Sequence, residues 1–113
     1  MLSIRIQSVD TEFEARLTSP DGSEASGRIE WKRYGSGETR LKVKAIGLDE
    51  LGNYAVQLFV DQISLGETVA CKGKVRWELN SRDGDSVPEI SDQQVAELRS
   101  NGTVLLRGVF EPD

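Results

Sequence analysis

Apolar and polar residues alternate one by one along much of this chain. The alternation is clear in residues 13–17, 29–31, 41–45 and 75–79. A period of two is typical of antiparallel β-strands that bury one face and expose the other. Residues 2–6 show the same alternation and predict a similar first strand. The pattern therefore predicts an antiparallel sheet with one buried face and one wet face.

Turn-forming residues lie between these segments. Gly, Asp, Asn, Ser and Pro cluster at 19–23, 34–37, 49–53 and 81–85, and such residues favour tight turns. The strongest signal is Asn101-Gly102, which is typical of the type I′ turn that joins two antiparallel strands. The segments on either side of this dipeptide are therefore expected to pair.

Two segments leave more than one interpretation open. In residues 91–99, Ser91 and Gln94 have the spacing of a helix capping box. A two-residue hairpin needs a strand entering it, so we favour a strand here, with a single helical turn near Asp92 compatible with both interpretations. Residues 54–60 are apolar on both sides, which indicates a strand covered on both faces or a contact with a partner.

Together these elements predict a single all-β domain over residues 1–113. About eight or nine short strands, with turns roughly every 8–12 residues, are typical of an antiparallel β-barrel or a β-sandwich. The pattern alone does not choose between the two. The length of 113 residues suits one domain, and 37% hydrophobic with 29% charged residues is a soluble globular composition.

A short pattern occurs twice in the chain, 46 positions apart. Residues 13–31 and 59–77 share F-x3-[LI]-x9-G-[KR]-[IV]-x-W without a gap. The match predicts an internal pseudo-repeat in which each half has a Gly-led strand with an inward tryptophan. Glycine at such a place often marks a bulge or a bend, which favours a sheet that closes on itself. The matched pairs are Phe13 with Phe59, Leu17 with Ile63, Gly27 with Gly73, Arg28 with Lys74, Ile29 with Val75, and Trp31 with Trp77.

Charged residues fall in blocks along the chain. Bases concentrate in residues 28–44 and 72–82, although the net charge is −5. Trp31 and Trp77 lie on the same face of their predicted strands as the apolar residues, so we expect both in the core. The basic residues that alternate with them are expected to point outward. This basic strip either pairs with acidic neighbours across strands or forms a face for an anionic ligand or an acidic partner. The candidate binding residues are Arg28, Lys32, Lys74 and Arg76.

Nucleic acid is the less favoured partner for this strip. The net charge of the chain is negative, and the strip has no exposed aromatic residues interleaved with its bases.

The residue composition excludes several kinds of catalytic and metal-binding site. It has no histidine, which removes Ser-His-Asp and Cys-His nucleophile systems, and its single cysteine, Cys71, can form neither an internal disulfide nor a thiolate zinc site. The two common phosphate-binding glycine motifs are absent. We therefore expect no enzyme activity and no cofactor.

One acidic turn carries candidate metal ligands. Asp83, Asp85 and Glu89 are closely spaced carboxylates of the kind that bind hard cations. Their spacing does not match an EF-hand loop, and a solvated acidic turn is the default interpretation, so we expect no metal.

Two stretches resemble a known family. They are "SGRIEWKRYGSGETRLKVKAIGL" at 26–48 and "LRSNGTVLLRGVF" at 98–110, about a third of the chain. They are similar to the opening segment and the closing hairpin of the CHRD domain, a small all-β family. The resemblance implies an all-β fold. The histidine-containing segment of that family has no counterpart in residues 49–60, so no histidine or metal role is implied.

These observations favour a non-catalytic interaction module. We expect it either to self-associate, as a dimer for which strand exchange is one route, or to bind a protein partner. The alternative is a small-molecule or carbohydrate-binding domain. No apolar run approaches the roughly 20 residues that span a bilayer, and the first residues lack the features of a signal peptide. We therefore expect a cytoplasmic setting and no membrane contact.

Overall fold

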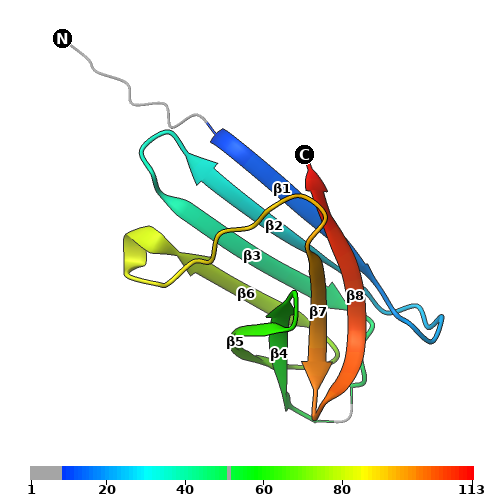
Figure 1. Ribbon diagram of the computed structural model, residues 1–113. Helices are drawn as coiled ribbons and strands as arrows, with labels where there is room; N and C mark the ends of the chain where they lie inside the picture. Colours follow the sequence, from blue (N-terminus) through cyan, green and yellow to red (C-terminus); the bar gives the residue numbers. More distant parts are fainter. Residues whose placement is uncertain (1–8, 51) are drawn as a thin grey trace.

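The fold is all-β, as the alternation predicts. The structure is a computed structural model that describes residues 9–50 and 52–113, so the predicted first strand at 2–6 lies outside the described residues. The elements in chain order are β1 (Val9–Thr18), β2 (Ser26–Tyr34), β3 (Thr39–Ile46), β4 (Tyr54–Val60), β5 (Ile63–Ala70), β6 (Val75–Asn80), the 3-10 turn η1 (Ser81–Asp83), β7 (Val95–Ser100) and β8 (Thr103–Pro112) (Figure 1).

The described strands form one antiparallel sheet that curls into a nearly closed barrel. Their order is β5-β4-β7-β8-β1-β2-β3-β6, so β5 and β6 are the two margins of the sheet. These margins meet at one end, where Lys72 and Gly73 form a tight turn with positive φ and Cys71 bridges Lys74. Of the two predicted architectures, the structure has the barrel and not the sandwich.

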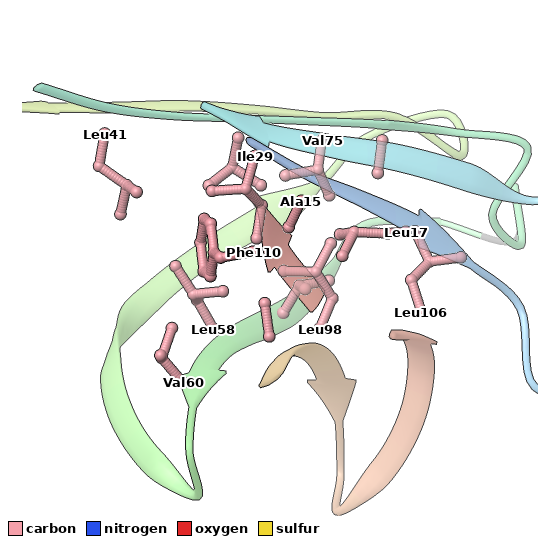
Figure 2. Packing of buried hydrophobic residues seen from close by; sticks show 14 of the residues in the cluster. Ala15, Leu17, Ile29, Leu41, Leu58, Val60, Val75, Leu98, Leu106 and Phe110 are labelled. Atoms are coloured by element: carbon pink, nitrogen blue, oxygen red, sulfur yellow. The ribbon is translucent and has the colours of Figure 1, made fainter. Parts of the chain in front are cut away.

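The interior of the barrel is filled by the inward side chains of both walls. In Figure 2, residues of β1, β2 and β6 meet residues of β4, β7 and β8. Trp31 is the largest fully buried side chain, 1% exposed, and its indole N–H donates a hydrogen bond of 2.9 Å to the carbonyl oxygen of Pro88. Trp77 is half-buried and packs against the same core. The prediction that both tryptophans are core residues is confirmed.

The open sequence interpretations are settled in favour of strands. Residues 95–100 form β7, and Asn101 and Gly102, both with positive φ, join it to β8. The capping-box contact also exists, because the Ser91 N–H donates to the Gln94 side-chain oxygen at 2.7 Å, but it closes a turn and starts no helix.

The strand at 54–60 is covered on both faces by its own chain, at least in part. Val56, Leu58 and Val60 point into the core, and the Arg99 guanidinium lies 4.1 Å from the ring centroid of Phe59 on the outer side. Its apolar outer face therefore needs no partner to explain it.

The predicted pseudo-repeat is wrong at its apolar positions. Phe13 packs on Trp31 inside the barrel, with ring centroids 5.9 Å apart, whereas Phe59 lies on the outer wall. Leu17 is buried, but Ile63 is 66% exposed. The physical reason is that residues 13–17 lie within one strand, while residues 59–63 cross the turn between β4 and β5.

We expect Gly108→Ala to lower the free energy of unfolding by about 3 kcal/mol. A Cβ at Gly108 would lie 2.1 Å from the carbonyl oxygen of Arg16, and this backbone atom of β1 cannot retreat without disturbing the β1–β8 pairing. Urea denaturation followed by tryptophan fluorescence measures the change. Val109→Ala, at the exposed neighbouring position, is the control and should cost less than about 1 kcal/mol. Equal losses in both variants would contradict the close approach of β1 and β8.

Candidate functional site

Four cations lie in register across the outer wall of the barrel. Arg16 of β1 lies opposite Arg28 of β2. Arg28 in turn lies opposite Lys44 of β3, which lies opposite Arg76 of β6. We call these four residues the basic row. Neighbouring strands are about 4.8 Å apart, and like charges directly opposite one another destabilise a sheet, so the row costs stability wherever anions do not compensate it.

The half of the basic row on β1 and β2 is compensated by the chain itself. Arg28 lies 2.9 Å from a Glu30 carboxylate oxygen and 3.6 Å from a Glu14 carboxylate oxygen. Arg16 shares Glu14 at 3.7 Å. This half follows the first sequence interpretation, in which basic residues pair with acidic neighbours across strands.

The half on β3 and β6 has no such compensation. Lys44 and Arg76 are exposed, and no carboxylate of residues 9–50 or 52–113 forms an ion pair with either of them. Ile46, which follows on β3, is 57% exposed beside them. This end of the row therefore offers free positive charge next to a small apolar surface.

The four candidate residues from the sequence do not all come together. Arg28 and Arg76 belong to the basic row. Lys32 lies further along β2, where its ammonium is 3.4 Å from a Glu12 carboxylate oxygen. Lys74 lies at the β5–β6 turn, where its backbone pairs with Cys71.

Arg16 and Lys44 are members of the row that the sequence analysis missed as candidates. The alternation gives their outward direction. Their place beside Arg28 depends on strand register, which the alternation does not contain.

The predicted metal candidates are dispersed into separate local contacts. Asp85 accepts a hydrogen bond of 3.0 Å from the Asn80 N–H, Glu89 pairs with Arg33, and Asp83 lies in η1. Within the described part of the chain, no group of three or more acidic or cysteine side chains could hold a metal ion.

Two buried carboxylates each lie between two arginines. Glu38 is 2.7 Å from Arg82 and 3.5 Å from Arg40, which fastens the β2–β3 turn to η1. Glu97 pairs with Arg99 and lies 3.8 Å from Arg107 on the outer wall. Both carboxylates thus have cationic partners within the chain, although neither carboxylate oxygen of Glu38 accepts a hydrogen bond from the described residues.

Two groups with displaced pKa values lie away from the basic row. Hydrogen bonds from the Ser19 hydroxyl and the Ser23 N–H lower the pKa of Asp21 in the β1–β2 turn. Burial, followed by the charge of Asp49, raises the pKa of Tyr54. Turn hydrogen bonds account for the first shift, and burial with a nearby carboxylate accounts for the second.

The outer wall has shallow hollows among the described residues. One of about 450 Å³ lies between β1 and β8 beside Arg16, and one of about 100 Å³ lies over β2, β3 and β6 beside Lys42. Charged residues of both signs line each of them. Among the described elements there is no helix with the length and apolar character to cross a membrane.

Comparison with family models and curated proteins gives no indication of what the outer wall binds. The chain matches no family model, and no curated protein shows a significant match to it. The resemblance to the CHRD family stays a prediction.

We expect Lys44→Gln to raise the free energy of unfolding by a few tenths of a kcal/mol at low salt. The substitution removes one of three adjacent cations, Arg28, Lys44 and Arg76, that lie in register. The gain should shrink as added salt screens the charges. Chemical denaturation at low and high ionic strength measures it.

Lys32→Gln is the matched control, because it removes the same type of charge from a residue that has a carboxylate partner. It should lower stability slightly. A stability loss for Lys44→Gln equal to that of the control would show that Lys44 is compensated after all.

Proposed function

We propose that this domain is a non-catalytic interaction module that binds an acidic protein partner on its basic row. The observation that carries the proposal is the register of the row, on a chain whose net charge is −5. Lys44 and Arg76 have no ion-pair partner among the described residues. Carboxylates of a partner would supply the missing counter-charges, and such complementarity speeds association and fixes orientation.

Several features favour an acidic protein surface over a long polyanion. Glu14, Glu30 and Glu78 lie on the same outer wall, two residues along their strands from the row, and a nucleic acid laid over the row would meet them. The row itself contains no aromatic side chain on which bases could stack. A compact patch of carboxylates fits the free end at β3 and β6 without facing these glutamates.

The alternative, a small-molecule or carbohydrate-binding domain, has less support. Apolar side chains such as Leu98, Phe110 and Leu58 occupy the barrel interior (Figure 2), so a small ligand would bind in one of the outer hollows. A cytoplasmic setting belongs to the main proposal, because the one cysteine, Cys71, is an exposed free thiol, which suits a reducing compartment.

The test uses a labelled oligo-glutamate peptide as the probe and fluorescence anisotropy as the measurement. The wild-type chain should bind the peptide, with an affinity that falls as salt rises. The double variant Lys44→Gln/Arg76→Gln should bind about tenfold more weakly, since two exposed ion pairs together contribute roughly 1–2 kcal/mol.

The control for this test is Lys32→Gln/Arg107→Gln, which removes the same charge from residues that have carboxylate partners. It should bind nearly as well as the wild type. Equal weakening in both double variants would mean that net charge, and not the row, attracts the peptide. Tighter binding of a single-stranded oligonucleotide than of the peptide would overturn the choice of partner.

A further inference from the structure

We propose that β6 pairs edge to edge with the β6 of a second copy of this chain, across a two-fold axis at Trp77. This inference goes beyond the acidic-partner surface and does not depend on it. It begins from the margin of the sheet, where β6 has one neighbour, β3, among the described strands (Figure 1).

The backbone of β6 shows which groups are free. In an antiparallel strand, alternate residues direct both N–H and C=O to the same side. Lys74 directs both groups to Cys71, with distances of 2.9 and 3.0 Å. At the other end, the Asn80 N–H donates to Asp85, and the Asn80 carbonyl accepts from the Asp85 N–H at 3.3 Å.

Arg76 and Glu78 lie between these two closed ends. By the same alternation they direct their N–H and C=O groups away from β3. The strand β5 has diverged there: among residues 9–50 and 52–113, β5 and β6 are bridged at Cys71 and Lys74 alone. Within the described residues these backbone groups have no partner.

Arg76 and Glu78 carry opposite charges, so each can pair with the other residue in a second copy of the chain. If Arg76 lies opposite Glu78 of a second β6, the two-fold axis also places Glu78 opposite Arg76 of that copy. Each of these two pairs would make two backbone hydrogen bonds, which uses every free group between the closed ends. Each pair would also set opposite charges side by side on the outer face, where cross-strand ion pairs stabilise a sheet.

Charge and backbone together select this register. A shift that places Arg76 on the axis brings two arginines together, and one that places Glu78 there brings two glutamates together. Either shift also requires Lys74 or Asn80, whose backbone groups already have partners. On the inner face, the chosen register sets Trp77 opposite Trp77 of the second copy, where each ring already packs against the backbone of Gly66 in its own β5.

The margin formed by β5 is less suited to the same pairing. Its ladder with β4 is interrupted by a bulge at Leu65, and Gly66 beside it has φ of 146°. Bulges twist an edge strand and protect it from further pairing. β6 has neither a bulge nor a proline, so it is the margin that can accept a strand.

Charge reversal on the chain alone tests the proposal, with sedimentation velocity over a wide range of concentrations. The wild type should form a dimer. R76E and E78R each set like charges opposite each other, and each should raise the dissociation constant of the dimer by about tenfold or more. The double variant R76E/E78R restores both opposite-charge pairs and should recover the dimer. A one-to-one mixture of the two single variants should form a heterodimer.

E24R is the control, because it makes the same exchange of charge at an exposed loop residue away from β6 and should leave the dimer unchanged. Circular dichroism of every variant checks folding. Amide hydrogen exchange gives an independent result: the Arg76 and Glu78 amides should become protected as the dimer forms. A chain that stays monomeric, singles that dimerise as the wild type does, or unprotected amides in the dimer would each overturn the proposal. Since no acidic partner is present, none of these outcomes bears on the basic row.

Discussion

One strand register ties the buried core of this domain to its charged outer wall. The pairing that sets Phe13 beside Trp31 in the interior also sets Arg16 opposite Arg28 on the exterior, because side chains alternate along every strand. A slip by one residue would expose the core, so the chain cannot relieve the row of like charges by shifting a strand. Only substitution or a counter-charge can relieve it. The fold therefore holds the four cations of the basic row opposite one another.

The carboxylates that the chain buries are compensated within it, which contrasts with Lys44 and Arg76 at the free end of the row. Glu38 and Glu97 are buried, and each has two arginine partners. Glu14 serves two arginines at the β1 and β2 end of the row. Lys44 and Arg76 lie on β3 and β6, and β6 is a margin of the sheet that the described strands form. The unpaired cation Arg76 and the unpaired backbone groups of β6 thus lie on the same margin of the sheet.

The sequence alone predicts the strands, the inward tryptophans and the outward bases, because each of these depends on local alternation. It does not predict that Lys44 joins the row, because β3–β6 pairing brings together residues more than thirty positions apart, Lys44 and Arg76. The false repeat arises at the turn between β4 and β5. Asp61 and Gln62 turn the chain with positive φ, although neither is a glycine, and the Asp61 carboxylate holds this turn by accepting from the Val95 N–H at 2.9 Å. Because that contact comes from a strand distant in sequence, the local pattern of residues 59–63 does not reveal the turn.

The two proposed associations share Arg76, and this links them. In a β6–β6 dimer, a glutamate of the second copy would lie beside Arg76 and compensate the end of the row. An acidic partner that needs the charge of Arg76 would then bind the monomer more tightly than the dimer. By thermodynamic reciprocity, the same partner would weaken dimerisation by the same factor. Lys44, one strand in from the margin, keeps its charge free in both states, so the partner would lose part of its surface on dimerisation and not all of it. The open margin of the barrel would in this way set how strongly its outer wall binds.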